Sequence, residues 1–278
     1  MSFKIVVDSC CEMTAAMKQD SCFIKVPLTI ACNGSSFVDD ETFDQADLLW
    51  AMKQSKDAPA TACPSPQTYM DAFDCGADDV YVVTLSALLS GSHNSAQQAK
   101  SLLEEEKPEV NIHVFNSCSA VCGETAIALK IKELAEQGVP FKKLVREVEQ
   151  FVARMETLFV LEDLENLRKN GRLTKLQAVA TAALRIKLFC HATPEGEIGK
   201  VGQALTIKQA LQKMVEKAAS DPDHEGRPVY ITHVNCLERA FKVKEMLEEK
   251  CRFSGIFITE AGGITTVYAN DGGIVIAY

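Results

Sequence analysis

Over residues 1–155, short apolar stretches typical of β-strands alternate with stretches in which the apolar residues have the spacing of an α-helix. Phe3–Ser9 is the first expected strand, and residues 23–33 with 35–40 resemble a second strand followed by a hairpin-like return. Further strands are expected at Asp79–Leu85 and Asn111–Ser117. Because the strands are apolar and helical segments separate them, the pattern predicts a mostly parallel sheet with flanking helices.

Single residues mark the ends of two expected helices. Thr42 is a suitable N-cap for a helix over residues 42–54. Gly138 marks the C-terminal end of a helix that begins near Cys122, because glycine readily adopts the left-handed conformation that closes a helix. These two residues therefore predict the start of one helix and the end of another.

The pattern changes near residue 155, which divides the chain into an expected domain of residues 1–155 and a second of residues 156–278. In the second part, helices separate strands that are expected near residues 157–163, 228–234, 255–261 and 272–278. We therefore expect a two-domain α/β protein in which the second domain contains a mixed sheet.

Loops rich in small residues follow three of the expected strands: "DSCCEMT", "TLSALLSGS" and "NSCSAVCG". Ligands of parallel sheets bind beyond the carboxyl ends of the strands, so these are candidate ligand loops. In the second loop, Ser90, Gly91, Ser92 and His93 lie where a helix begins. Backbone N–H groups and hydroxyls at such a position suit a small anion, either a carboxylate or a phosphate.

A second hydroxyl-rich loop and one arginine are further candidates. Thr61 lies in the proline-rich stretch "APATACPSPQ", and Arg172 lies beside a glycine turn in "RKNGR". Serine and threonine in loops are commonly turn or cap residues, and an arginine in a turn is commonly a surface charge. Alternatively, the hydroxyls bind an anion, and the arginine binds a planar oxyanion through two hydrogen bonds.

The composition excludes several classes of protein. A content of 47% hydrophobic and 24% charged residues is typical of a soluble globular chain, and a formal charge of −9 without a basic run argues against nucleic-acid binding. No apolar stretch reaches the ~18 residues that a membrane-spanning helix needs, so we expect no stable membrane insertion. The start "MSFKIVVDS" lacks the long apolar region of a signal peptide, which favours a cytoplasmic location.

The sequence contains neither a metal-binding spacing nor a cofactor motif. The eleven cysteines include no C-x-x-C pair, and the five histidines have no partner ligand at helical spacing. In a reducing compartment most such cysteines are small buried side chains. The glycine-rich nucleotide motifs, G-x-S-x-G and H-E-x-x-H are all absent. We therefore expect no metal and no cofactor. His113 alternates with apolar residues in an expected strand, so we expect it to have a structural role.

Several short motifs, in order, resemble those of the DegV family. Each is weakly specific alone, whereas their shared order from residue 6 to residue 173 is fairly specific. They are "VVDS" (Val6–Ser9), "VPL" (Val26–Leu28), "TACPS" (Thr61–Ser65), "SALLSGS" (Ser86–Ser92), "FNSCS" (Phe115–Ser119) and "RKNGRL" (Arg168–Leu173).

The resemblance implies a two-domain protein that buries one long-chain fatty acid between its domains. Characterised DegV proteins act as the fatty-acid-binding subunit of a bacterial fatty acid kinase and present the carboxylate to a separate ATP-using subunit, which makes an acyl phosphate. By position, Thr61 and Ser90 match the carboxylate-binding residues, and Arg172 matches an arginine linked to phosphotransfer or partner contact. The chain is therefore expected to be a lipid-binding carrier rather than an enzyme, with Leu176–Phe189 as part of the channel wall.

This sequence departs from the family pattern at positions that bear on function. Tyr268 lies where a histidine is frequent, and Leu205 or Ile207 lies where arginines occur. Such basic residues are plausible contacts for a kinase, so fatty acid binding is better supported than a kinase partnership. Two alternatives stay open: a regulator that senses lipid without a kinase partner, and a transferase or hydrolase that uses Ser90 or Cys63.

Overall fold

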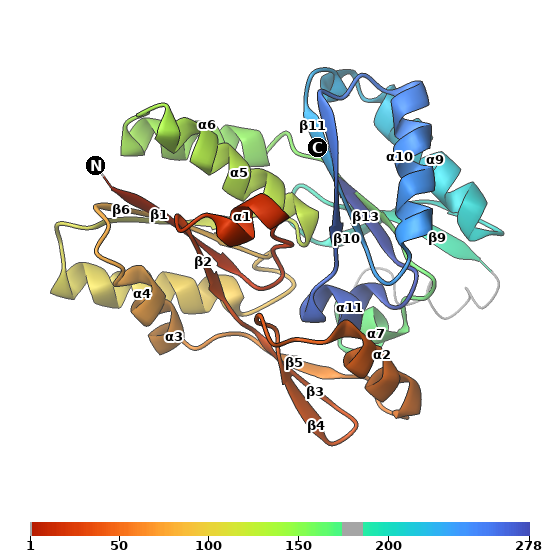
Figure 1. Cartoon of the computed structure of the whole chain (residues 1–278), viewed down its shortest axis with the longest axis horizontal. Coiled ribbons are helices and arrows are strands. Elements are labelled where there is room, and N and C mark those ends of the chain that lie inside the picture. Colours follow the sequence, from red (N-terminus) through yellow and green to blue (C-terminus); the bar gives the residue numbers. More distant parts are fainter. Residues whose placement is uncertain (1, 174–185) are drawn as a thin grey trace.

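The first half of the chain forms a parallel four-stranded sheet with helices on both faces (Figure 1). The computed structural model describes residues 2–173 and 186–278. The strand order is β2-β1-β6-β7, and every neighbouring pair is parallel, as the alternation of strands and helices predicts. The strands are β1 (Phe3–Asp8), β2 (Phe23–Val26), β6 (Asp79–Thr84) and β7 (Asn111–Asn116).

Both faces of this sheet are buried because successive side chains of a strand point to opposite sides. On β1, Val6 packs with α3 (Pro66–Phe73) and α4 (Ser92–Glu106). Its neighbours Ile5 and Val7 pack on the opposite face. The helices of that face are α5 (Cys122–Glu136) and α6 (Phe141–Val152).

The second half forms a mixed sheet of six strands in the order β10-β9-β8-β13-β11-β12. Only β11 and β12 pair in parallel, and the other neighbours are antiparallel. The strands are β8 (Thr157–Val160), β9 (Lys187–Ala192), β10 (Ile198–Ala204), β11 (Pro228–His233), β12 (Gly255–Glu260) and β13 (Ile274–Ala277). The expected α/β class with one parallel and one mixed sheet is confirmed.

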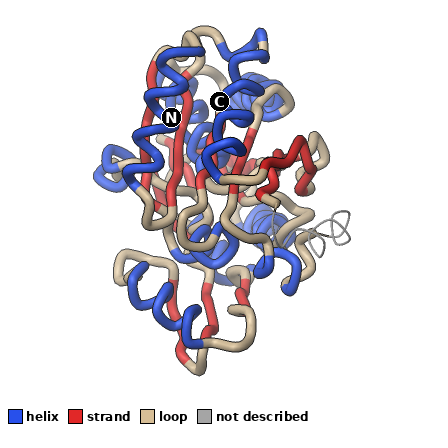
Figure 2. Tube along the Cα trace, turned by 90° about the vertical axis from the view of Figure 1, so that its right-hand side faces the viewer, coloured by secondary structure: helices blue, strands red, loops and turns tan. Residues whose placement is uncertain are grey.

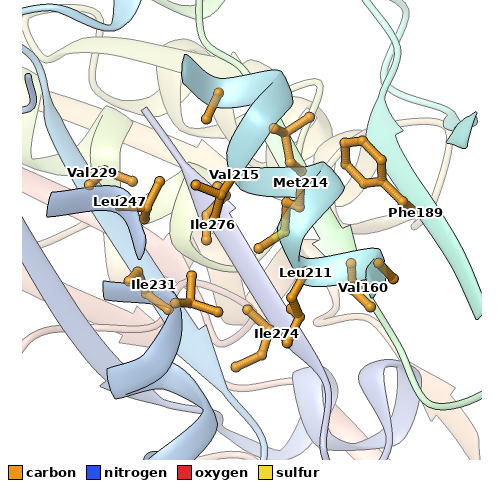
Figure 3. Packing of buried hydrophobic residues seen from close by; sticks show 14 of the residues in the cluster. Val160, Phe189, Leu211, Met214, Val215, Val229, Ile231, Leu247, Ile274 and Ile276 are labelled. Carbon is orange, nitrogen blue, oxygen red and sulfur yellow. The ribbon is translucent and has the colours of Figure 1, made fainter. Parts of the chain in front are cut away.

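Two helices cover the outer face of the mixed sheet (Figure 3). These are α9 (Ile207–Ser220) and α10 (Leu237–Lys250). Met214 of α9 and Leu247 of α10 point toward Ile276 and its neighbours on the central strands. This cluster is a second hydrophobic core, separate from that of the parallel sheet. Burial of each side chain of this size stabilises the fold by roughly 1.5–3 kcal/mol.

Helix α5 lies between the two sheets and contacts β1 and β6 on one side and β11 and β13 on the other. Ile127 packs with the parallel sheet, whereas Ala126 packs with Tyr230 and Val275 of the mixed sheet. A helix packed on two sides needs apolar or small residues around most of its circumference. The residues of α5 from Cys122 to Ala128 are all buried, and apart from Glu124 they are all apolar or small.

A small antiparallel sheet and several short helices complete the described chain. The sheet has the order β4-β3-β5, and Figure 2 shows it with α2 at one end of the molecule. Its strands are β3 (Thr29–Cys32), β4 (Ser35–Val38) and β5 (Ala60–Ala62). The remaining helices are α1 (Ala15–Gln19), α2 (Gln45–Gln54), α7 (Glu165–Lys169), α11 (Gly263–Ala269) and the 3₁₀ turn Pro222–His224.

The expected helix ends are confirmed in one case and wrong in the other. Gly138 has φ of 69°, the left-handed conformation expected after a helix. The N-cap of α2 is Asp44 and not Thr42, because the Asp44 side chain accepts the N–H groups of Ala46 and Asp47. The Thr42 hydroxyl instead donates to Asp40.

The described structure does not test two further expectations, the channel-wall segment and the domain boundary. The segment Leu176–Phe189, expected to form part of the channel wall, falls mostly on residues 174–185, outside the described ranges. The boundary at residue 155 stays a prediction, although the strands of the parallel sheet all precede it and those of the mixed sheet all follow it.

Candidate functional site

An apolar cavity lies where the loops of the parallel sheet meet the mixed sheet. Its walls come from both halves of the chain, and most of the atoms that face the cavity are carbon, although Ser119, Thr157, Glu197 and Thr265 also belong to the lining. The loops after β1, β6 and β7 contribute Cys10, Leu85, Leu89, Ala120 and Val121; the mixed sheet contributes Phe159, Ile198 and Val275; and α11 contributes Ile264 and Ala269. A dry cavity of this kind suits a hydrocarbon chain and not a polar metabolite.

Arg172 and Tyr268 form a polar boundary of the cavity. The guanidinium of Arg172 lies over the ring of Tyr268, with its central carbon 5.6 Å from the ring centroid. The Arg172 Nε–H donates to the carbonyl of Leu89 at 3.2 Å, and a second N–H donates to the carbonyl of Asn170. These contacts hold a positive charge at the edge of a largely apolar cavity whose lining also includes the carboxyl residue Glu197.

Thr61 reaches this boundary through Tyr268. The Thr61 Oγ1 and the Tyr268 hydroxyl are 2.7 Å apart, so one of them donates to the other. Thr61 lies on strand β5, paired with Ile30 of β3, and not in the irregular loop that the prolines predict. The residue after β5 and the loop after β6 also meet, because a Cβ at Gly91 would lie 3.1 Å from the Sγ of Cys63. The fold therefore brings together the two hydroxyl-bearing segments that were singled out separately in the sequence.

The hydroxyl of Ser90 has a fixed role as an acceptor within its own loop. The backbone N–H of Ser92 donates to Ser90 Oγ at 3.2 Å, while the Ser90 N–H donates to the carbonyl of Ser86. Among the described residues, no protein atom accepts the proton of Ser90 Oγ. That proton can therefore be donated to a ligand at the N-terminal end of α4, where Gly91 is the N-cap.

Ser92 and His93 point their side chains into the protein. The Ser92 hydroxyl is buried and contacts Asp8 and Tyr69, each at 2.6 Å. The His93 Nδ1 lies 3.1 Å from the hydroxyl of Thr84, and burial lowers the pKa of the imidazole. These contacts account for both side chains structurally, and the prediction that the two residues contact a ligand stays a prediction.

Two buried carboxylates of the first half hold the start of α11. Glu12 accepts the N–H of Gly262 at 2.8 Å, and Asp39 accepts those of Gly263 and Ile264 at 2.7 and 3.0 Å. These N–H groups have no partner within the helix itself. Burial, together with the nearby Asp39 charge, raises the pKa of Glu12 to about 8. The helix that carries Tyr268 is thereby fixed to the loops of the other half.

Sequence reasoning missed these acids and the contact made by Tyr268. Asp8 was visible only as part of the "VVDS" motif, and α11 was not expected because "GGITTVYA" contains two glycines and four β-branched residues. Tyr268 was noted only as a departure from the family pattern. Its contact with Thr61 depends on tertiary folding, for which a single sequence carries no direct signal.

A second, larger depression is a poor candidate for the same ligand. It is an open groove of about 1,320 Å³ between α2 and α7, lined by residues such as Asp44, Lys53 and Glu165. Charges of both signs line it, so an apolar chain would gain little by entering it. The smaller cavity at Tyr268 fits the predicted ligand better.

No group of three or more His, Cys, Asp or Glu side chains in residues 2–173 and 186–278 is arranged to hold a metal ion. Within the same ranges, no helix combines the length and apolar character needed to cross a bilayer.

Comparisons with known proteins agree in one family. The DegV family, described as uncharacterised proteins, matches residues 2–278. A DegV domain-containing protein of Streptococcus pyogenes serotype M1 is 33% identical over 284 residues, covering 100% of this chain and 99% of that protein.

Two solved structures are similar over the same length. A DegV family protein of Ruminococcus gnavus with vaccenic acid has a TM-score of 0.96 and 44% identity, and 100% of this chain and 99% of that chain are covered. The fatty acid kinase (Fak) B3 protein of Streptococcus pneumoniae, loaded with linoleic acid, has a TM-score of 0.90 and 31% identity, with the same coverage of 100% and 99%. This chain belongs to the DegV family.

Proposed function

We propose that this protein binds one long-chain fatty acid, with the acyl chain in the apolar cavity and the carboxylate at Thr61 and Ser90. The observation that carries the proposal is a largely apolar cavity bounded by Arg172 and Tyr268. Its lining residue Leu89 directly precedes Ser90, whose hydroxyl proton has no protein acceptor in the described chain. The relatives from Ruminococcus gnavus and Streptococcus pneumoniae were solved with vaccenic and linoleic acid, which supports this class of ligand.

The acyl chain supplies most of the binding free energy in this proposal. Burial of roughly fourteen methylene groups at ~0.8 kcal/mol each gives on the order of 11 kcal/mol, from which the cost of ordering the ligand is subtracted. The described residues enclose about 100 Å³. Ligand pockets usually hold roughly 300–1,000 Å³, so a whole acyl chain needs more space than these residues enclose.

The head group is selected by hydrogen-bond donors. Ser90 Oγ already accepts an N–H, so it interacts with a carboxylate as a donor. When the Tyr268 hydroxyl donates to Thr61 Oγ1, Thr61 likewise directs its proton outward. Hydrogen bonds to an ionised acceptor are stronger than neutral ones, so two hydroxyls with a nearby guanidinium can hold a carboxylate without a direct ion pair.

Replacement of either hydroxyl is expected to weaken binding of palmitate about tenfold. The variants are Thr61→Val and Ser90→Ala. Loss of a hydrogen bond to a charged group costs roughly 1.5–3 kcal/mol, and each 1.4 kcal/mol of binding free energy changes the affinity tenfold, so tenfold is the lower end of the expected loss. The measurement is displacement of a fluorescent fatty acid. Ser101→Ala is the matched control, because its exposed hydroxyl lies on α4 and donates to the carbonyl of Gln97.

The proposal would be overturned by a purified protein that never carries lipid. Native mass spectrometry is expected to show one bound acyl chain, and its mass identifies the fatty acid. An empty protein whose melting temperature does not rise with palmitate or oleate would contradict the proposed function, because a ligand that binds the folded state must stabilise it.

We further propose that the bound carboxylate is presented to a separate fatty acid kinase subunit. In that reaction a carboxylate oxygen attacks the γ-phosphorus of ATP, ADP leaves, and an acyl phosphate forms. Arg172 lies at the boundary of the cavity, where a positive charge would stabilise the transferring phosphoryl group. The family relationship to the B3 protein of a fatty acid kinase supports this step.

Arg172→Ala is expected to slow acyl phosphate formation about tenfold while palmitate still binds, because a fixed charge that stabilises the transition state is lost. The assay contains a bacterial fatty acid kinase subunit, ATP and lipid-loaded protein. Arg252→Ala, which changes an exposed arginine of the second half, is the control. If the unmodified protein binds lipid but no acyl phosphate forms, the lipid-sensing alternative is favoured. The exposed Leu205 is consistent with that alternative, because it lies where family members have an arginine that could contact a kinase.

The hydrolase alternative receives no support from the described contacts. A serine nucleophile needs a base within hydrogen-bonding distance. The partner of Ser90 Oγ is a backbone N–H, and His93 contacts Thr84 instead. Cys63 is exposed, and its Sγ lies 4.0 Å from the hydroxyl of Ser95, which is not a base.

A further inference from the structure

Asp8 joins both ends of the loop that carries Ser90. It is the last residue of β1, and its side chain is completely buried. Its Oδ2 accepts the N–H of Leu85 at 3.0 Å and the hydroxyl proton of Ser92 at 2.6 Å, while its Oδ1 accepts the N–H of Cys10 at 3.1 Å. Leu85 and Ser92 begin and end the loop, so one carboxylate sets the distance that the loop spans.

The hydrogen bonds around Ser92 have a defined direction. Ser92 donates its only hydroxyl proton to Asp8, so the Tyr69 hydroxyl must be the donor in its 2.6 Å contact with Ser92 Oγ. The backbone N–H of the same serine donates to Ser90 Oγ. A continuous series of contacts therefore leads from Asp8 through Ser92 to the hydroxyl that faces the proposed carboxylate.

The neighbouring acid Glu124 does not compete with Asp8 for these donors. Glu124 is completely buried in the first turn of α5, where its carboxyl group lies beside that of Asp8 and accepts none of the three donors named above. Burial, with the nearby charge of Asp8, raises the pKa of Glu124 well above its usual value. Burial also raises the pKa of Asp8, but three donors stabilise its anion. The proton of the pair therefore resides on Glu124 and the charge on Asp8.

We propose that Asp8 is a positioning residue for the ligand: through Ser92 it fixes the direction of the Ser90 hydroxyl and so makes the site prefer a carboxylate to an uncharged head group. The inference rests on the proposed function, because it concerns the same head-group site. Asp8 touches neither the ligand nor Ser90 in this arrangement. It acts by keeping the acceptor side of Ser90 occupied, so that only the donor side faces outward.

Asparagine cannot reproduce this arrangement, although it has the same shape. Both carboxylate oxygens accept from backbone N–H groups, one from Cys10 and one from Leu85. A backbone N–H cannot reverse its direction. Either orientation of an asparagine amide therefore places its NH₂ group against one of these donors, and a hydrogen bond is lost.

The test compares two ligands with the same acyl chain, palmitate and hexadecanol, in affinity measurements on the whole protein. In Asp8→Asn, the ratio of the palmitate affinity to the hexadecanol affinity is expected to fall about tenfold, with the hexadecanol affinity almost unchanged. Asp79→Asn is the matched control, because Asp79 is buried at the other end of β6 and accepts a hydrogen bond from Asn111 at 2.8 Å. Its ratio is expected to equal that of the unmodified protein.

Substitutions at Ser92 provide the second arm, which does not depend on whether Asp8→Asn folds. Ser92→Ala removes the donor to Asp8 and is expected to lower the ratio, whereas Ser92→Thr keeps a hydroxyl and is expected to restore it. An unchanged ratio in Ser92→Ala, or equal weakening of both ligands, would overturn the positioning role. Failure of the proposed function would look different, because the unmodified protein would then bind neither ligand.

Discussion

Gly196→Ala is expected to lower the free energy of unfolding by about 3 kcal/mol. Gly196 has φ of 89° in the turn between β9 and β10, where an L-residue costs roughly 1–2 kcal/mol. Its new Cβ would lie 2.3 Å from Ser86 Oγ and 2.9 Å from the Cα of Cys118. Overlap with a packed backbone adds roughly 1–3 kcal/mol. Urea unfolding, followed by circular dichroism, measures the change.

The same substitution is also expected to break a contact between the halves of the chain. The Ser86 hydroxyl donates to the carbonyl of Gly196 at 2.7 Å, which joins the loop after β6 to the mixed sheet. Gly226→Ala is the matched control, because Gly226 has φ of 76° but no described atom would lie within 4 Å of a Cβ added there. That control is expected to lose only about 1 kcal/mol, the cost of the backbone conformation. Equal losses in the two variants would contradict the packing argument.

The stability of the protein is expected to fall as the pH rises from about 5 to about 8. The pKa of Glu12 is raised from 4.5 to about 8 in the folded protein, so the folded state keeps a proton that the unfolded state has already released. The stabilisation is complete below the unfolded pKa and is lost as the pH passes the folded one. The total change is on the order of a few kcal/mol. The raised pKa values of Asp8 and Glu124 act in the same direction.

Glu12→Gln is expected to remove much of this pH dependence. Glutamine does not titrate, and its carbonyl oxygen can still accept the N–H of Gly262. The measurement is the free energy of unfolding in urea at pH 5.5, 7.0 and 8.5. Glu41→Gln, at an exposed position near Asp39, is the control and is expected to leave the slope unchanged. A slope that is the same in Glu12→Gln as in the unmodified protein would contradict the assignment.

The sequence predicts the parts of this fold that depend on local pattern. Strand β6 and helix α4 were expected because a run of β-branched residues is followed by small residues and then by a helical segment. Ser90 and Thr61 were identified through short motifs, Ser90 in the loop between these two elements and Thr61 in a stretch that forms strand β5 instead of the expected loop. The helix cap at Thr42 was wrong because Asp40, two residues earlier, accepts the Thr42 hydroxyl proton, and Asp44 caps the helix instead.

Features that depend on distant residues were not predictable. The contact between Thr61 and Tyr268 spans 207 positions, and that between Glu12 and Gly262 spans 250. Helix α11 has weak intrinsic propensity because it is short and β-branched, and its first N–H groups are satisfied by Glu12 and Asp39 rather than by a local cap. Tertiary contacts stabilise this helix, so its own residues could not indicate it.

The position of β13 has a consequence for folding during synthesis. Residues 274–277 pair with β8 on one side and β11 on the other, so the mixed sheet has no connection across its middle until these residues have left the ribosome. The parallel sheet is complete by residue 116 and can fold earlier. One flank of α5 stays uncovered until β11 and β13 arrive, and a nascent chain would expose apolar surface there to chaperones. The cavity, which Val275 helps to line, can therefore close only after the parallel sheet has formed and β13 has been added.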